Sequence, residues 1–489
     1  MIKWLPTVMT FTPLIFAVLI MLVPRKNESA MKFLALIGTG LVLVGSIIMF
    51  AVFDASASGF QMLVKVQWIE VLGADYHMGV DGISLPLIFL TALITFVAVA
   101  ASWNISFRVK EYMSLIVFLE VGMIGVFLAL DFILFYVFWE MVLIPMYFLI
   151  GIWGGPRKEY AAIKFFLYTF IGSIFMLLGI LAVYFYSGLG TFDMMLLADA
   201  SIPTDVLKIA FLGMFLGFAV KVPIVPFHTW LPDAHVEAPT AVSVILAGVL
   251  LKMGTYAFIR IGLQVVYGGM KHFLWMIAAL GVISIIYGAL NAMVQKDLKK
   301  LVAYSSISHM GFVMLGVASA SNEGINGAIY QMFSHGIISG MLFLVVGLIY
   351  ERTHTREIDK LGGLFLNPRT GVIAGIWVFI SMASFGIPSL AGFIGEFLVL
   401  TGSFPVYRVM TTIAALGIIL TAGYYIWTIQ RICFGESKSK EILADATPLE
   451  LSYMIPMMLI IVVLGVYPAS LLDAITPSVA AIIAKIGGL

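Results

Sequence analysis

Long apolar runs separated by short polar loops extend along the whole chain. A run of about 17 to 25 apolar residues can cross roughly 30 Å of hydrocarbon as one α-helix. The pattern predicts fourteen such spans, at 7–23, 33–53, 84–102, 112–130, 132–151, 163–186, 206–223, 240–262, 273–293, 300–320, 326–350, 371–400, 407–431 and 450–470. The first run ends in LVPRKN without a small-residue cleavage pattern, so we interpret it as a helix and not as a signal peptide. We therefore expect an all-α polytopic membrane protein.

Composition supports this class and excludes several functions. The 489 residues are 62% hydrophobic and 11% charged, whereas about a quarter of the residues in soluble domains are charged. A net charge of +1 without any basic tract argues against nucleic acid as a partner. The single cysteine, Cys433, excludes an internal disulfide, a thiolate cluster and a CxxC site. No GxGxxG or GxxxxGK[ST] motif is present, so we expect this chain to bind no cofactor and no metal.

The distribution of basic residues between the spans predicts the orientation. Of 27 Lys and Arg residues, 17 fall in loops on one side, six on the other, and four within spans or at their ends. Cytoplasmic loops are enriched in Lys and Arg, so both termini should face away from the cytoplasm. The consistent asymmetry also favours an even number of spans.

Six ionisable side chains lie within the apolar spans and are our candidates for proton transfer: Glu140, Lys221, Lys252, His309, His335 and Glu396. A charge at bilayer depth costs roughly 2.5 to 3.5 kcal/mol, and such residues mark ion pathways or proton relays. Six of them together cost on the order of 10 kcal/mol, which indicates a function beyond packing. The structural alternatives are static ion pairs that fix the helices and buried histidines that are merely hydrogen-bonded.

Glu140 and Lys221 are the clearest candidate pair. At roughly 8 Å and an effective dielectric constant of about 20, the two charges would attract by about 2 kcal/mol. Opening or closing the pair would change how readily the lysine holds its proton. Two side chains would then form a proton switch that needs no metal or cofactor.

Polar side chains at helical spacing extend this set on three further spans. They are Lys252, Tyr256 and Arg260 on 240–262; Tyr304, Ser305, Ser308 and His309 on 300–320; and Gln331, His335 and Ser339 on 326–350. Imidazole titrates near pH 6.5 and can pass a proton between its two nitrogens, which suits a relay. The auxiliary candidates are Glu120, Tyr256, His228 and Ser305.

The loop after span 206–223 contains residue types that also bind metals. These residues are His228, Asp233, His235 and Glu237, but their spacing matches no standard ligand pattern. We expect them to fix the loop and not to bind a metal ion.

Two spans are interrupted beside an ionisable residue. Pro223 and Pro226 follow Lys221, and Pro388 stands among glycines just before Glu396. Broken helices at matching positions are typical of inverted-repeat transporters. Because the breaks are five helices apart, we predict two inverted five-helix repeats, helices 4–8 (112–262) and 9–13 (273–431), preceded by 1–103 and followed by helix 14 (450–470). The alternative is that the prolines only kink bundle helices.

The stretch VKVPIVPFHTWLPDAHVEAPTAVSVILAGVLLKMGTYAFIR closely resembles the signature of the proton-translocating membrane subunits of respiratory complex I, which are similar to Mrp-type antiporter subunits. FYVFWEMVLIPMYF, AYSSISHMGF and PSLAGFIGEF extend the resemblance across nearly all spans. The family's helix 5 glutamate falls on Glu140, its helix 7 and 8 lysines on Lys221 and Lys252, and its helix 12 residue on Glu396. One subunit type of complex I also has glutamate at the position of Glu396 and ends soon after helix 14, so the chain most resembles that type.

The resemblance implies a non-redox subunit of NADH:quinone oxidoreductase in a bacterial inner membrane. Neighbouring subunits would include similar pumps and a quinone-site subunit, and partner subunits would carry FMN and iron–sulfur clusters. Protons would enter from the cytoplasm, pass Lys221, Lys252 and His309, and leave by Glu396. The alternatives are a subunit of a Mrp-type Na⁺/H⁺ antiporter, a pump module of a membrane-bound hydrogenase, and a purely structural scaffold.

Overall fold

The computed structural model describes residues 2–366, 370–436, 438 and 443–487. The chain forms two compact units. Unit 1 comprises Met1–Pro223, Val249–Met276 and Asp473–Leu489, and unit 2 comprises Ile224–Gly248 and Ile277–Leu472. Arg369 and Lys440, which contribute to the predicted charge asymmetry, lie outside the described residues.

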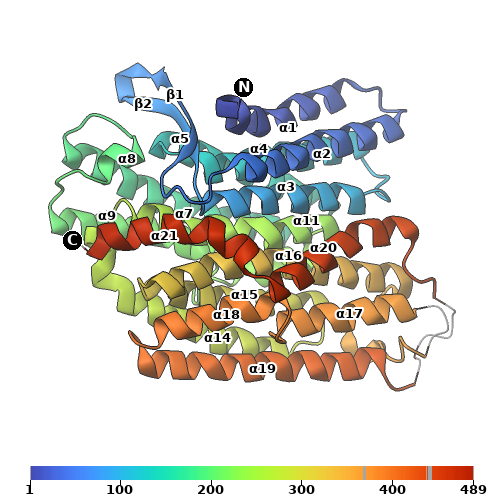
Figure 1. Cartoon of the computed structure of the whole chain (residues 1–489). Coiled ribbons are helices and arrows are strands. Elements are labelled where there is room, and N and C mark those ends of the chain that lie inside the picture. The colour runs from blue at the N-terminus through green and yellow to red at the C-terminus, as the bar shows by residue number, and fades with distance from the viewer. Residues whose placement is uncertain (1, 367–369, 437, 439–442, 488–489) are drawn as a thin grey trace. The chain divides into compact units, whose positions relative to one another are not determined.

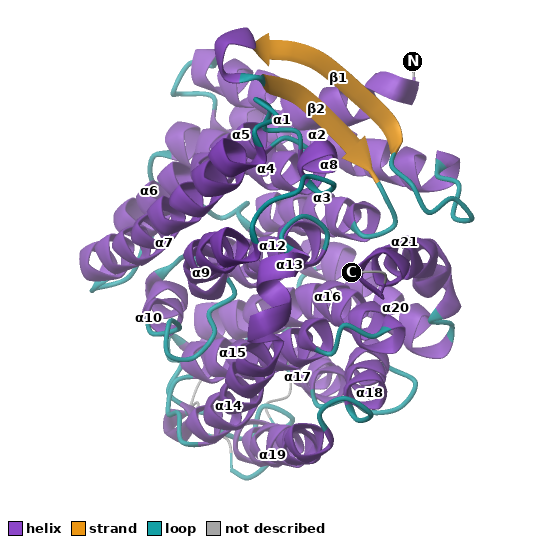
Figure 2. Ribbon diagram, turned by 90° about the vertical axis from the view of Figure 1, so that its left-hand side faces the viewer, coloured by secondary structure: helices purple, strands orange, loops and turns teal. Residues whose placement is uncertain are grey.

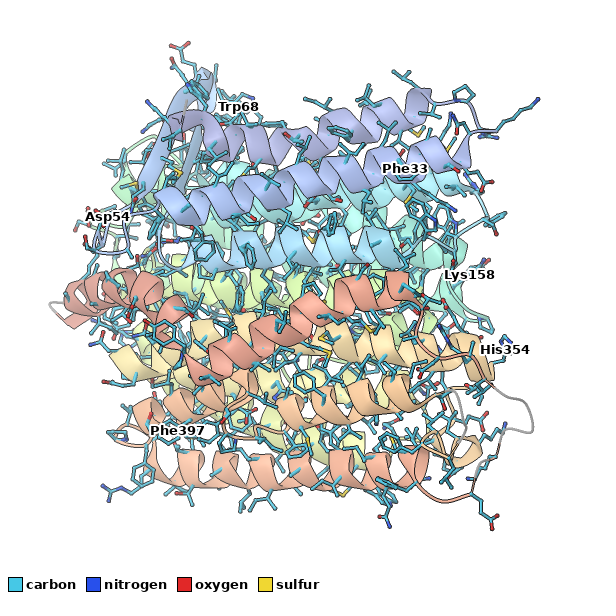
Figure 3. The ribbon with its side chains drawn as sticks, turned by 45° about the vertical axis from the view of Figure 1, so that its right-hand side comes forward. Phe33, Asp54, Trp68, Lys158, His354 and Phe397 are labelled. Carbon is cyan, nitrogen blue, oxygen red and sulfur yellow. The ribbon has the colours of Figure 1, made fainter. Side chains whose placement is uncertain are left out.

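Unit 1 is mainly a bundle of helices, most of which are long and apolar. In chain order they are α1 (Leu5–Leu22), α2 (Glu28–Val52), α3 (Ser84–Ala101), α4 (Val109–Leu128), α5 (Phe132–Met141), α6 (Leu143–Trp153), α7 (Lys158–Ser187), α8 (Met194–Leu197), α9 (Thr204–Lys221), α12 (Leu251–Ala257), α13 (Tyr267–Met270) and most of α21 (Ala469–Gly487). Helices α1 to α4 lie side by side, and α9 packs along α7 (Figure 1). Asp54 and Lys158 lie at opposite ends of this bundle (Figure 3).

The predicted helical membrane fold is confirmed, and a β-hairpin in unit 1 is an addition to it. Strands β1 (Gln61–Ile69) and β2 (Ala74–Val80) pair in antiparallel fashion around a short 3₁₀ turn and Gly73, whose φ is 65° (Figure 2). A search for apolar runs of membrane-spanning length misses these strands, because they have only nine and seven residues.

The hairpin is attached to two loops of unit 1. Met78 forms a backbone bridge with Ala129, and Asp131 forms one with Asp193. Lys65 Nζ lies 2.7 Å from Asp193 Oδ2, and His77 Nδ1 lies 3.0 Å from the same oxygen. Burial alone would raise the pKa of Asp193, but hydrogen bonds and charge from His77 and Lys65 hold it well below its ordinary value. This cluster fixes the hairpin at the bundle end that also carries Asp54 (Figure 3).

Unit 2 is organised around one long buried helix. In chain order its helices are α10 (Trp230–Glu237), α11 (Thr240–Ile245), most of α14 (Leu274–Met293), α15 (Leu298–Ala318), α16 (Asn322–Thr353), α17 (Gly371–Ser384), α18 (Ala391–Ser403), α19 (Arg408–Cys433) and α20 (Pro448–Val466). Helix α16 packs against α11, α15, α17, α18 and α20, and nearly all of its residues are buried. A helix that is buried on nearly all of its faces is suited to this central position.

The described residues contain thirteen helices or helix pairs that are long and apolar enough to cross a membrane. Twelve coincide with predicted spans. The thirteenth is α21, which the prediction missed because Asp473, Pro477 and Lys485 interrupt its apolar pattern. The two remaining predicted spans are the ones expected to be interrupted.

Both interruptions are confirmed. Helix α9 ends at Lys221, just before Pro223, while α17 ends at Ser384 and α18 begins only at Ala391. Gly386, with a φ of 78°, and Pro388 lie within the second break. The inverted relation between the two repeats stays a prediction.

Candidate functional site

Lys221 and Glu140 lie near the ends of two helices in unit 1. Lys221 is the last residue of α9, where the helix dipole favours a cation, and it is 2% exposed. Its Nζ lies 5.3 Å from the centroid of the Trp139 ring, and Trp139 Nε1 donates a hydrogen bond to Ser173 Oγ at 3.1 Å. The aromatic face thus holds the ammonium group in place.

Glu140 is half-buried in the last turn of α5, one residue after Trp139. Its charge acts on Lys221, and Ser173 lies beside it. Among the described residues no ion pair within 4.0 Å joins Glu140 to Lys221, and Glu140 Oε1 accepts no hydrogen bond. The two charges therefore interact without direct contact, which is the arrangement that a switch requires.

Gly254 sets the distance between the end of α9 and α12. A Cβ atom at this position would lie 2.9 Å from Val222 N and 3.0 Å from Phe218 O. Only glycine permits this approach of the two backbones. Lys252, two residues away, is completely buried.

Helix α12 has a π-helical segment on each side, at Leu246–Leu250 and Phe258–Leu263. Such segments are rare and occur frequently at functional sites. The predicted polar stripe is present here: Arg260 Nε donates to Tyr256 Oη at 2.9 Å, and Tyr256 Oη donates to Phe127 O at 3.0 Å. Arg260 also forms an ion pair with Asp81, with 2.6 Å between Arg260 Nη2 and Asp81 Oδ1.

Glu120 on α4 is completely buried. Within the described part of the chain, neither of its carboxyl oxygens has a hydrogen-bond partner. Buried polar groups are nearly always satisfied, so this carboxyl group stands out as one available to take up a proton or a hydrogen bond.

In unit 2, His309 and Glu396 are in direct contact. His309 Nδ1 lies 2.8 Å from Glu396 Oε1, and the two side chains are 3% and 4% exposed. His309 Nε2 lies 3.3 Å from Ser384 Oγ, at the end of α17. Gln331 Nε2 donates to the same Glu396 oxygen at 3.4 Å. The second broken helix thus places a carboxyl group against an imidazole, with both imidazole nitrogens engaged.

The surrounding polar groups continue from this pair. The rings of His309 and His335 are 5.3 Å apart, centroid to centroid. On the neighbouring helices, Tyr424 Oη donates to Ser305 Oγ at 2.7 Å, and Tyr425 Oη lies 3.1 Å from that oxygen. Groups that can donate and accept protons therefore cluster at the core of unit 2.

Two histidines of the loop cluster pack against different aromatic rings. His228 packs against the rings of Tyr287 and Tyr304, whereas His235 stacks on Phe343 with a centroid distance of 4.3 Å. Over the described ranges, no group of three or more His, Cys, Asp or Glu side chains has an arrangement that could hold a metal ion.

Sequence reasoning missed Asp81, Ser384, Tyr424 and Tyr425. Asp81 stands in VDGIS, which has the appearance of an ordinary turn, and its partner Arg260 is 179 residues away. Ser384 was not distinguishable from the other small residues of its span. The two adjacent tyrosines in an apolar run could have been recognised from the sequence. A buried tyrosine hydroxyl group usually has a hydrogen-bond partner, so the pair indicates polar groups nearby.

Comparison with known families decides the relationship. The model of the family described as NADH:quinone oxidoreductase/Mrp antiporter, transmembrane, matches residues 129–421. The chain belongs to this family. NADH-quinone oxidoreductase subunit M of Rhodobacter capsulatus is 44% identical over 493 residues, covering 97% of this chain and 95% of that protein.

Solved structures agree with this assignment. A chain of respiratory complex I from Thermus thermophilus with bound NADH has a TM-score of 0.88 and 30% identity, covering 99% of this chain and 100% of that one. A chain of the Mrp complex from Dietzia sp. DQ12-45-1b has a TM-score of 0.87 at 20% identity, covering 99% and 98%, and shows likeness of fold alone. The family match includes all six proton-transfer candidates, whereas Asp81 lies outside it.

Proposed function

We propose that this chain is a proton-translocating membrane subunit of a complex I type NADH:quinone oxidoreductase. Full-length similarity to a protein named subunit M supports this function. The observation that carries it is Lys221, buried at the broken end of α9, held by Trp139 and within reach of the charge of Glu140. A purely structural lysine would be expected in a closed ion pair or at the membrane interface.

The residues of unit 1 suggest how a proton is held and released. When Glu140 is charged and near, it stabilises the ammonium form of Lys221; when the pair opens, the buried lysine loses that support and releases its proton. Lys252 is the next buried base along the proposed route. In unit 2, His309, His335 and Glu396 supply the groups that pass the proton on, with Glu396 proposed as the last residue.

The driving reaction is proposed to occur in partner subunits. One cysteine cannot build a thiolate cluster, so we propose that this chain contains no redox centre and that FMN, iron–sulfur clusters and the quinone site belong to neighbouring subunits. Changes in the charge of neighbouring subunits would open and close the Glu140–Lys221 pair.

We also propose that the chain lies in a bacterial inner membrane with both termini on the non-cytoplasmic side. The basic loops of unit 1 include Arg25, Arg108 and Lys158, and Lys158 marks the end of the bundle opposite Asp54 (Figure 3). This end would face the cytoplasm.

Replacement of Lys221 by Ala tests the proposal. In proteoliposomes containing the whole complex, Lys221→Ala should lower the rate of NADH-driven proton uptake at least about tenfold. This corresponds to an increase of about 1.4 kcal/mol in the activation free energy. Lys208→Ala, on the exposed part of the same helix, is the matched control and should pump normally. Unchanged uptake in an assembled Lys221→Ala complex would refute the function proposed for this lysine.

The fold likeness to a Mrp complex supports one alternative, a sodium/proton antiporter subunit. A sodium gradient alone would then drive proton movement in vesicles, without NADH. Our proposal predicts that NADH oxidation is required.

A further inference from the structure

A cavity of about 240 Å³ opens at the hairpin end of unit 1, and every residue that lines it belongs to this unit. Its mouth contains exposed residues, including Ser58, Asp199 and Lys485, whose Nζ lies 2.6 Å from Asp199 Oδ1. Its floor contains the buried side chains of Asp81 and Arg260. The cavity therefore connects a polar surface with a buried ion pair.

The floor is held by an ordered set of hydrogen bonds. Arg260 is 1% exposed and uses all three of its nitrogens, on Tyr256 Oη, Gln264 Oε1 and Asp81 Oδ1. Asp81 Oδ1 also accepts from the backbone N–H groups of Ile83 and Ser84, at 3.2 and 2.9 Å.

The other carboxyl oxygen of Asp81 has a different environment. Among the described residues, Asp81 Oδ2 accepts no hydrogen bond. This atom is not fully buried, so solvent can reach it. An oxygen in this position, in a residue that lines the cavity, is available to water or to a proton.

Polar groups continue inward from the floor. Tyr256 connects Arg260 to the backbone of α4 through Phe127 O, and it lies one helical turn after Lys252. The π-helical turn that contains Arg260 begins two residues after Tyr256. Tyr256 thus links the floor of the cavity to the face of α12 that carries Lys252.

We propose that this cavity is a water-filled vestibule through which Lys252 exchanges protons with solvent at the hairpin end, with the Asp81–Arg260 pair as its gate. The inference rests on the proposed function and adds, in unit 1, a second route to solvent besides the exit proposed at Glu396. A proton leaves the Lys252 ammonium group, is carried by water past Tyr256 to Asp81 Oδ2, and goes on to the water of the cavity. Only N–H and O–H bonds form and break.

The guanidinium group of Arg260 serves as the barrier. A fixed positive charge in a narrow polar route repels protons and prevents leak, as in other selective pores. Protonation of Asp81 weakens its hold on Arg260, so the barrier shifts only while Asp81 carries the proton. Asp81 and Arg260 are thus gating residues.

Cysteine labelling tests whether the vestibule is wet and on which side it opens. Gln264→Cys places a thiol in the cavity lining, whereas Ile259→Cys places one on the same π-helical turn away from the lining. The native Cys433 is buried. With a charged, membrane-impermeant methanethiosulfonate reagent, Gln264→Cys should react at least about tenfold faster than Ile259→Cys, and only from the non-cytoplasmic side. Equal rates, or labelling from the cytoplasm, would overturn the vestibule.

Substitution of the gate is the second test. Asp81→Asn should lower NADH-driven proton uptake several-fold, whereas Asp205→Asn, at an exposed aspartate of unit 1 outside the cavity lining, should pump normally. Arg260→Gln removes the barrier charge and should raise passive proton leak in the absence of NADH, an effect that a merely structural role would not produce. If Lys221→Ala abolishes pumping but Asp81→Asn and Arg260→Gln behave as wild type, the proposed function stands and this inference fails.

Discussion

Replacement of Glu396 by Gln separates the chemistry of this residue from its structural contribution. Glutamine has the same shape and keeps a carbonyl oxygen that can accept from His309 and Gln331. It has no negative charge and cannot bind a proton reversibly at neutral pH. The substitution therefore removes proton exchange while it retains most of the packing.

The expected change in stability follows from the contact. The 2.8 Å hydrogen bond joins two side chains that are only 3% and 4% exposed. A hydrogen bond to a charged group contributes about 1.5 to 3 kcal/mol and a neutral one about 0.5 to 1.5, so Glu396→Gln should cost about 1 to 2 kcal/mol. Glu396→Ala removes the partner of His309 altogether and should cost about 3 to 5 kcal/mol.

The assay compares assembly with pumping in the same preparation. The Glu396→Gln complex should assemble, oxidise NADH and show proton uptake reduced at least about tenfold relative to wild type. Glu357→Gln, at an exposed glutamate of the same unit, is the matched control and should pump normally. An assembled Glu396→Gln complex with wild-type proton uptake would show that this carboxyl group does not carry protons.

Three further predictions concern unit 1. Gly254→Val should destabilise the chain by about 1 to 3 kcal/mol and lower pumping, because its Cβ would meet the backbone at Val222 N, whereas Gly59→Ala, with open space around it, should have neither effect. Glu120→Leu should raise the melting temperature, since it removes a buried carboxyl group that has no hydrogen-bond partner among the described residues, and should lower pumping; normal pumping would remove Glu120 from the route. Burial raises the pKa of Asp131 to about 6, against hydrogen bonds from three backbone N–H groups. The folded chain then keeps a proton that the unfolded chain loses between pH 3.8 and about 6, so the free energy of unfolding should fall across this window by about 3 kcal/mol. Asp131→Asn in detergent should lack this slope, and an identical slope in the variant would contradict the assignment.

The features that sequence predicted well are those encoded locally. Twelve of the spans follow from apolar length alone, and the breaks after Lys221 and before Glu396 follow from proline and glycine, whose backbone effects do not depend on distant partners. The candidate residues were found in the same way, because a charge within an apolar run needs no structural context to be noticed.

The features that were missed depend on partners far away in the chain. The hairpin is held in place by Asp193, which lies more than a hundred residues after β2. Asp81 is recognisable as a candidate only because it forms an ion pair with the distant Arg260. Likewise, the sequence identified both His309 and Glu396, but their contact depends on how α15 and α18 pack. Pairing and register are tertiary properties that periodicity cannot specify.

The most direct test of proton transfer by these buried groups is the number of protons moved per NADH oxidised by the reconstituted complex. With Lys221→Ala, we predict that this ratio falls below the wild-type value while electron transfer to quinone continues. A ratio equal to that of wild type in the assembled variant would contradict the account.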